Sequence, residues 1–207
     1  MSPSTLTQRP DLATPTDQPL TIEQYAQSET PERSELVRGT VVDMPSPKPL
    51  HGWVSSEVVY LLKTWGRQAG FEVFDNSGVA TENEAAAPGS VRGPDSYAIR
   101  RQRITSLTDY FAVPPELCVE VRSPSETLTS LRAKADEYLA FGVAVVWCID
   151  PEGEWLEVST QAGRQLFDAG EMTPPHEALP GLSLAIADFF PRFPIRDADA
   201  SNNGGDA

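Results

Sequence analysis

The sequence predicts an α/β fold in which a mixed β-sheet is flanked by helices, with an antiparallel hairpin added at its C-terminal side. A strand–helix–strand run between residues 117 and 149 implies one right-handed parallel crossover. The strands after that run are joined by tight turns, which favour antiparallel neighbours. A sheet that combines both kinds of pairing and carries helices on its faces belongs to the α/β class.

The first expected elements are a short helix and a hairpin-like pair of strands. Residues 20–27 predict the helix, with Thr21 as its N-cap and Gln24 at the capping-box position. Residues 34–44 predict two short strands around the turn dipeptide Arg38-Gly39. These elements precede the longer, more apolar segments from which we expect the main sheet.

A long helix is expected over residues 51–68, because apolar side chains recur on one broad face, and Gly70 supplies a stop. Residues 71–74 and 96–99 predict strands, with an irregular, alanine-rich loop between them. The predicted apolar face of the helix consists of Trp53, Val54, Val58, Leu61, Leu62 and Trp65.

The central part of the sheet is expected from two apolar runs. Residues 117–121 predict a buried strand, residues 127–141 a helix that ends at Gly142, and residues 143–149 the most apolar strand of the chain. A turn over residues 150–153 leads into strands near 155–159 and 165–167, and residues 182–190 close the domain.

Composition indicates one globular domain with polar tails. Hydrophobic residues make up 40% of the 207 residues, which is enough for a real core. We expect a disordered N-terminal tail over 1–19, a domain over 20–195 and a disordered C-terminal tail over 196–207. With no apolar run of about 18 residues and no signal-peptide pattern, we expect a cytoplasmic protein without a membrane partner. Cys118 and Cys148 lie in apolar runs and are expected to be buried free thiols.

Charge is distributed unevenly along the chain. The net charge of −14 argues against broad, non-specific affinity for nucleic acid. Residues 92–134 nevertheless contain seven basic and five acidic side chains, so this window carries +2 and the remainder −16. Two interpretations stay open: positive charge gathered near a phosphate-binding site, or a coincidence of surface arginines.

The main chemical signal is a carboxylate inside an apolar strand. Glu120 stands in the run of residues 117–121, and a buried carboxylate is unfavourable unless it is paired or binds a metal. Asp95 at the start of another strand and Lys134 on the following helix offer partners. Alternatively, Asp95 caps a turn and Glu120 faces water from an edge strand.

A pair of carboxylates on neighbouring strands suits a hard divalent cation. Mg²⁺ and Mn²⁺ take carboxylate, carbonyl and water oxygens, and here the ligands would be Asp95, Glu120 and the backbone carbonyl of Val121. Such a cation lowers the pKa of a bound water and polarises a phosphoryl oxygen. A neighbouring lysine neutralises developing charge. The spacing of 25 residues between the two carboxylates is by itself a weak signal.

Four segments strengthen the prediction: SELVRGTVVDMPSP, VRGPDSYAI, ELCVEVRSPSE and RAKADEYLAFGVAVVWCIDPEGEWLEV. Their order resembles the Uma-two family of endonucleases, in the restriction-endonuclease-like PD-(D/E)xK superfamily, over residues 20–190. The resemblance implies a restriction-endonuclease-like fold and a Mg²⁺- or Mn²⁺-dependent endonuclease. It implies metal-binding and catalytic roles for Asp95 and Glu120, a metal- or water-holding role for Glu35, and the displaced catalytic lysine for Lys134.

Three further residues are candidates for the surroundings of the site. Arg122 occupies the place two after the glutamate, where the simplest superfamily motif has lysine, and it is expected to pair with Glu120 or to contact phosphate. His51 opens the long helix, where the family often has a histidine, and a solvent-facing or capping role is the alternative. Tyr138 shares a helix face with Lys134, and a core role is its alternative.

Two functions from different classes therefore remain open. The first is an endonuclease that hydrolyses nucleic-acid phosphodiester bonds, with DNA as the expected substrate. The second is a catalytically inactive module of the same fold that binds nucleic acid or a protein partner, which the acidic composition favours. A homodimer is expected for a nuclease that cuts both strands of a duplex, with exposed Trp155 and Phe167 on the late hairpin as interface candidates.

Overall fold

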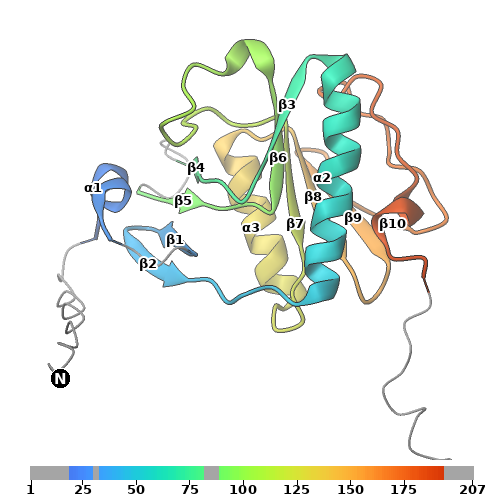
Figure 1. The fold of residues 1–207 in the computed structure, drawn as a ribbon, viewed down its shortest axis with the longest axis horizontal. Helices are drawn as coiled ribbons and strands as arrows, with labels where there is room; N and C mark the ends of the chain where they lie inside the picture. Colours follow the sequence, from blue (N-terminus) through green and yellow to red (C-terminus); the bar gives the residue numbers. More distant parts are fainter. Residues whose placement is uncertain (1–18, 30–32, 82–88, 194–207) are drawn as a thin grey trace, which may run out of the picture.

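The computed structural model describes residues 19–29, 33–81 and 89–193. Nearly all of the predicted tails, 1–19 and 196–207, lies outside the described residues. The described chain forms two sheets, a six-stranded sheet in the order β10-β9-β8-β7-β6-β3 and a four-stranded sheet in the order β2-β1-β5-β4. The smaller sheet and helix α1 lie beside the larger sheet (Figure 1).

The N-terminal elements follow the sequence prediction closely. Helix α1 (Ile22–Gln27) begins after Thr21, and Thr21 and Gln24 form the predicted capping box. Strands β1 (Ser34–Val37) and β2 (Thr40–Asp43) pair antiparallel. The turn between them needs positive φ angles at Arg38 (50°) and Gly39 (79°), and glycine accepts such an angle without strain.

Part of the predicted irregular loop belongs to the smaller sheet. Strands β4 (Val79–Ala80) and β5 (Val91–Arg92) pair antiparallel, and β5 also pairs with β1. Two-residue strands are too short to show the alternation by which a strand is recognised, so the sequence did not reveal them. Residues 82–88, which include most of the alanine-rich segment, lie outside the described residues.

The long helix α2 (Pro49–Ala69) ends at Gly70, whose φ of 79° provides the left-handed C-cap. Three residues of the predicted face lie outside its buried part: Leu61 and Trp65 are half-buried, and Trp53 faces away. Trp53 is 38% exposed, because it lies one residue, about 100° of helical rotation, away from the buried stripe. That stripe consists of His51, Val54, Val58, Leu62 and Gly66.

The larger sheet is mixed, as predicted. Strands β7 and β8 are parallel neighbours, and every other pair in this sheet is antiparallel. Helix α3 (Leu128–Phe141) makes the crossover between the two parallel strands, and β9 and β10 form the C-terminal hairpin. The strands are β3 (Phe71–Asp75), β6 (Ser96–Arg100), β7 (Leu117–Val121), β8 (Val145–Asp150), β9 (Trp155–Thr160) and β10 (Gly163–Asp168).

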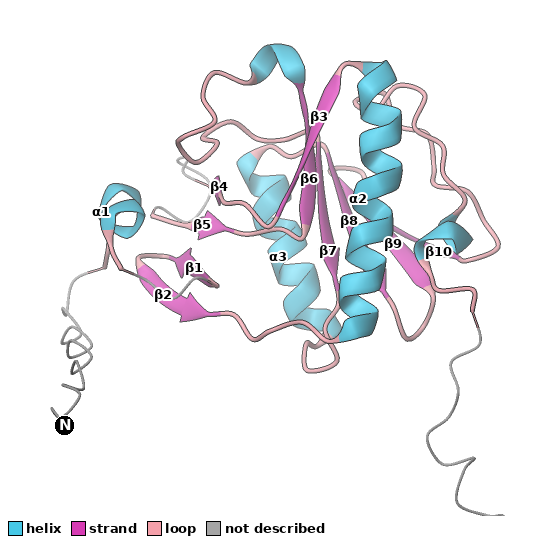
Figure 2. Ribbon diagram, viewed as in Figure 1, coloured by secondary structure: helices cyan, strands magenta, loops and turns pink. Residues whose placement is uncertain are grey.

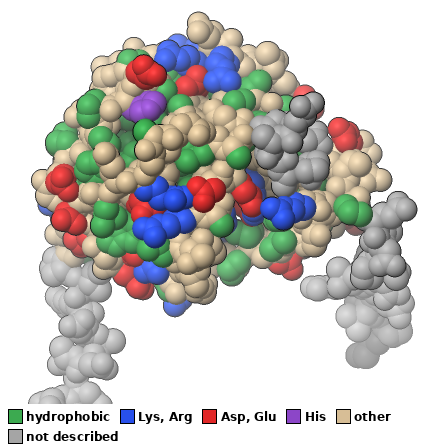
Figure 3. All heavy atoms as spheres, turned by 180° about the vertical axis from the view of Figure 1, so that it is seen from behind, with side chains coloured by type: hydrophobic (Ala, Val, Ile, Leu, Met, Phe, Trp, Pro, Cys, Tyr) green, Lys and Arg blue, Asp and Glu red, His purple; other side chains and the backbone are tan. Residues whose placement is uncertain are grey.

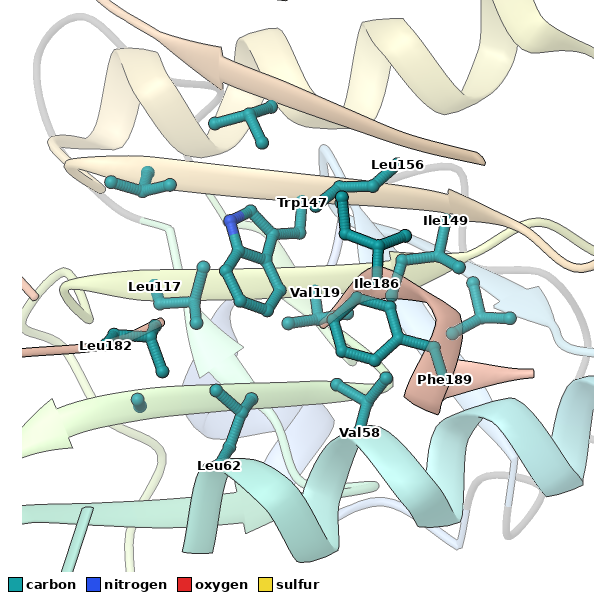
Figure 4. Close-up of a cluster of buried hydrophobic side chains, with 14 of the residues drawn as sticks. Val58, Leu62, Leu117, Val119, Trp147, Ile149, Leu156, Leu182, Ile186 and Phe189 are labelled. Carbon is teal, nitrogen blue, oxygen red and sulfur yellow. The ribbon is translucent and has the colours of Figure 1, made fainter. Parts of the chain in front are cut away.

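Helices α2 and α3 cover opposite faces of this sheet (Figure 2). Side chains alternate along a strand, so Val119 and Val121 of β7 join the core on the α2 side, whereas Cys118 joins the core on the α3 side. Figure 4 shows the first core, in which Val58 and Leu62 of α2 lie beneath Val119 and Trp147. The same alternation directs Glu120 toward α3.

The expectation that two apolar side chains of the C-terminal hairpin are exposed is wrong. Trp155 and Phe167 are half-buried, and Phe167 packs against the main core. Their neighbour Leu166 is 59% exposed instead, because side chains alternate along β10. Two short 3-10 helices complete the described elements, η1 (Arg101–Arg103) and η2 (Ile186–Phe189).

The cysteine expectation is confirmed. Cys118 and Cys148 are buried free thiols on adjacent strands. Among the described helices, none combines the length and the apolar character that crossing a membrane requires.

Candidate active site

The two predicted carboxylates meet where β6 and β7 lie side by side. The antiparallel register pairs Ser96 with Val119, and continuing it by one residue places Asp95 across from Glu120. Oδ2 of Asp95 accepts a hydrogen bond of 2.7 Å from the backbone N–H of Val121. Glu120 lies in the interior of a central strand and is 3% exposed. The alternative of an edge-strand glutamate facing water is therefore wrong.

Helix α3 supplies two donors to Glu120. The Tyr138 hydroxyl donates to Oε1 at 2.7 Å, and the Lys134 ammonium donates to Oε2 at 3.2 Å. Lys134 and Tyr138 are four residues apart and share a helix face, and that face turns toward the sheet. The ammonium also lies 3.5 Å from Glu126. The structure thus places Lys134 in the cleft and not in solvent.

Burial and charge act on Glu120 in opposite directions. Burial raises its pKa to about 7, the Lys134 ammonium opposes this rise, and the carboxylates of Asp95 and Glu35 add to it. The Glu120 carboxylate raises the pKa of Lys134 in turn, against the effect of burial. Lys134 therefore remains an ammonium across the neutral range while Glu120 changes its charge.

His51 contacts the other carboxylate. Its Nε2 lies 3.4 Å from Oδ1 of Asp95, and the Ser55 hydroxyl lies 3.4 Å from its Nδ1. Burial lowers the pKa of His51, but the Asp95 carboxylate, together with the Val121 backbone and the Glu120 carboxylate, outweighs burial, and the net shift is upward. The ring is buried at the start of α2, so the solvent-facing alternative is wrong.

Glu35 lines the same cleft from β1. Its Oε2 accepts a hydrogen bond of 2.8 Å from Arg92, and its Oε1 accepts one of 3.1 Å from the backbone N–H of Gly93. Arg92 also donates to Glu137 of α3 at 2.8 Å, so this guanidinium ties the smaller sheet to the helix. No local sequence pattern indicates this link, because Arg92 stands 57 residues from Glu35.

Arg122 does not pair with Glu120, and that expectation is corrected. Its Nε lies 2.7 Å from Oδ2 of Asp150, at the end of the parallel neighbour β8, and its Nη2 lies 3.9 Å from Glu152. The alternation rule failed because β7 ends at Val121, and beyond the strand a side chain no longer follows the pleat.

Of the two interpretations of the basic residues in the 92–134 window, the structure favours arginines paired away from the site over positive charge gathered around it. Within the described residues, Lys134 alone among the seven basic residues of the 92–134 window lines the cleft, and all seven are ion-paired. On the face seen in Figure 3, basic and acidic side chains lie next to one another. The pairs are Arg92–Glu35, Arg100–Glu116, Arg101–Glu72, Arg103–Glu116, Arg122–Asp150, Arg132–Glu157 and Lys134–Glu120.

The cleft that contains these groups has a volume of about 1290 Å³. Across residues 19–29, 33–81 and 89–193, no group of three or more Asp, Glu, His or Cys side chains is arranged to hold a metal ion. Mg²⁺ is commonly bound by one or two carboxylates, with waters and substrate phosphates as its other ligands. Asp95 and Glu120 offer such a donor set. The negative charges of neighbouring carboxylates disfavour the ionised form of Glu120, and a bound cation would offset this repulsion.

The fold has a counterpart among solved structures. The chain is similar to a crystal structure described as that of a putative nuclease belonging to DUF820 from Anabaena variabilis, with a TM-score of 0.71 and 22% sequence identity. The match covers 83% of this chain and 97% of that chain. The likeness shows the fold, which is the restriction-endonuclease-like α/β fold that the sequence resemblance implied.

The family follows from the sequence match. The model of the family Uma2, described as "Putative restriction endonuclease", matches residues 22–187. This range is most of the chain, and the protein therefore belongs to the Uma2 family. A comparison with curated proteins finds no match.

Proposed function

We propose that this chain is a divalent-metal-dependent endonuclease that hydrolyses phosphodiester bonds of nucleic acid, with DNA as the expected substrate. One observation carries the proposal: Asp95, one residue before β6, lies across from Glu120 of β7, with Lys134 at 3.2 Å from Glu120. Membership of a family described as restriction endonucleases supports it.

Asp95, Glu120 and the backbone carbonyl of Val121 are the groups that would hold Mg²⁺ or Mn²⁺. The bound cation would supply Lewis-acid chemistry, by polarising the phosphoryl oxygen and lowering the pKa of a water. Glu35 lines the same cleft and would help to hold the cation or the attacking water. Its fixed hydrogen bonds from Arg92 and Gly93 would keep it oriented.

Lys134 would act as an ammonium. The Glu120 carboxylate raises the pKa of Lys134, so at neutral pH this side chain neutralises charge on the phosphate and does not abstract a proton. Tyr138 would position Glu120 through its hydrogen bond of 2.7 Å. His51 would similarly hold Asp95. Arg122, whose guanidinium is engaged by Asp150, has no part in the proposed chemistry.

Calorimetric titration of Mn²⁺ tests the metal site directly. We expect binding to the wild-type chain and its loss in both Asp95→Asn and Glu120→Gln. Glu72→Gln is a matched control, since it removes an exposed carboxylate of β3 that pairs with Arg101. Unchanged Mn²⁺ affinity in the two site variants would contradict the proposal. Cleavage of a labelled DNA fragment with Mn²⁺, lost in the same two variants, would complete the test.

The alternative, a catalytically inactive module of this fold that binds nucleic acid or a protein, is supported by the pairing of all seven basic residues in the 92–134 window. It predicts no Mn²⁺ binding to the wild-type chain. A cytoplasmic location is proposed with either function. A homodimer is expected only if both strands of a duplex are cut, and mass measurement in solution tests it.

A further inference from the structure

The cleft extends beyond the carboxylates into a wall of aromatic rings. Five aromatic side chains line it together with Asp95 and Glu120. Three of the rings contact one another, with centroids 5.1 to 5.8 Å apart. The other two stack at 6.1 Å with an interplanar angle of 25°. We call this set the aromatic wall: Tyr25, Phe74, Tyr97, Tyr110 and Phe111.

Tyr110 is the most suitable member of the wall for contact with a ligand. Its side chain is half-buried, whereas Tyr25, Tyr97 and Phe111 are buried and the half-buried Phe74 packs against the core on the α3 side. A Cβ added at Gly78 would lie 2.7 Å from the Tyr110 ring. The ring can therefore pack here only because residue 78 has no side chain. The ring is therefore fixed by Tyr25 and Gly78 while part of it remains open to the cleft.

Two cations lie at the cleft besides Lys134. Arg33 and Lys48 line it and are exposed. Neither has an ion pair or side-chain hydrogen bond with another described residue, unlike the seven basic residues discussed above. Arg33 precedes β1 and Lys48 precedes α2, and both line the same cleft as Glu35. Exposed cations beside a carboxylate site suit a polyanion that extends past the reacting phosphate.

Aromatic rings and exposed cations in one groove are the features by which proteins hold single-stranded nucleic acid. In a duplex the bases are stacked on one another and are not available to a protein ring. An unpaired base can leave the stack and lie against an aromatic side chain, and any base offers a suitable face. The backbone then follows the positive side chains.

We propose that the cleft binds a single-stranded stretch of nucleic acid, with an unpaired base against the aromatic wall and its phosphate near Asp95 and Glu120. This inference rests on the proposed nuclease function and specifies its substrate class. A single-stranded substrate needs one site for each cut, so a monomer suffices. Single-stranded DNA and RNA share the chemistry of this proposal, and the experiment separates them.

Fluorescence anisotropy with a labelled single-stranded DNA oligonucleotide, its RNA equivalent and the matching duplexes tests the inference, with the full chain in EDTA to prevent cleavage. We expect the preferred single strand to bind at least tenfold more tightly than its duplex. Tyr110→Ala should weaken single-strand binding about tenfold, and Tyr110→Phe should keep it because the ring remains. Tyr60→Ala is the matched control, since Tyr60 is 66% exposed on α2 outside the cleft.

Arg33→Gln provides a second variant that does not disturb packing, because this side chain is exposed. It should weaken single-strand binding several-fold and lower its salt dependence, whereas Arg67→Gln at the end of α2 should change neither. Equal or tighter binding of duplexes, or unchanged binding by both Tyr110→Ala and Arg33→Gln, would overturn the inference.

The outcomes also separate this inference from the nuclease proposal. Mn²⁺ binding with a duplex preference would leave the nuclease proposal standing, and single-strand preference without Mn²⁺ binding would overturn the nuclease proposal alone.

Discussion

The Tyr138 hydroxyl donates a hydrogen bond of 2.7 Å to Oε1 of Glu120, and both side chains are buried. This contact joins helix α3 to the central strand β7 at the candidate site. It favours the ionised carboxylate, because the hydroxyl stabilises negative charge on Glu120 and so lowers its pKa, while burial raises it. The contact therefore both holds α3 against β7 and lowers the pKa of Glu120.

Removing the Tyr138 hydroxyl should destabilise the fold. Tyr138→Phe leaves the ring in the core but deprives Oε1 of Glu120 of its donor, and we expect a loss of about 1–3 kcal/mol in the free energy of unfolding. The loss should be larger at pH 8 than at pH 5, since the hydrogen bond favours the ionised form. Urea denaturation at both pH values measures it. Equal losses at the two values would contradict this assignment.

The raised pKa of Glu120 predicts a pH dependence of stability. The folded protein keeps a proton on Glu120 up to about pH 7, whereas the unfolded chain loses it near 4.5. Between these values the folded state binds more protons, so the contribution of Glu120 to the free energy of unfolding falls as pH rises. The slope is at most about 1.4 kcal/mol per pH unit.

Glu120→Gln isolates this contribution. The difference in free energy of unfolding between the variant and the wild type should shift in favour of the variant from pH 5 to pH 8. Glu72→Gln, which removes an exposed carboxylate, should show a constant difference over the same range. A pH-independent difference for Glu120→Gln would mean that the carboxyl group has an ordinary pKa in the folded protein.

Arg92 should be among the positions of the smaller sheet at which a substitution destabilises the fold most. Arg92→Met removes the partner of the buried Glu35 and leaves an uncompensated charge, so we expect a loss of about 3–5 kcal/mol. Arg92→Met combined with Glu35→Gln should recover part of that loss, because the unpaired charge is gone. Thermal melts of the single and double variants measure this. A double variant no more stable than Arg92→Met would show that the loss comes from packing.

Arg122 should matter for stability and not for metal binding. Arg122→Gln removes the ion pair at 2.7 Å with the buried Asp150, and a loss of about 1–3 kcal/mol is expected. The affinity for Mn²⁺ should stay that of the wild type, since Arg122 does not line the cleft in the part of the chain that the structure describes. Weaker Mn²⁺ binding in a folded Arg122→Gln protein would show that Arg122 contributes to the metal site.

Both thiols should be inert in the folded protein. Burial raises the pKa of Cys118 and of Cys148, and the Glu120 carboxylate raises both further, so the reactive thiolate is scarce. A thiol reagent such as Ellman's reagent should label neither cysteine under native conditions and both in denaturant. Rapid native labelling of either residue would show that the strands β7 and β8 open.

The sequence alone was sufficient for most of the fold. Capping residues located α1, glycine stops located the ends of α2 and α3, and apolar runs located β7 and β8, because these signals are local. It failed at β4 and β5, which are too short to carry a periodic pattern. The mixed sheet followed from the one crossover helix, since loop length limits how strands can pair.

The sequence also determined the candidate carboxylates, because a glutamate within an apolar strand requires a partner. Only the tertiary structure decided which partners are used. The register of β6 on β7 places Asp95 across from Glu120, and the orientation of α3 turns Lys134 inward. Arg92 with Glu35 and Arg122 with Asp150 were not predictable, because long-range pairing depends on where strands and helices end in space and not on spacing along the chain.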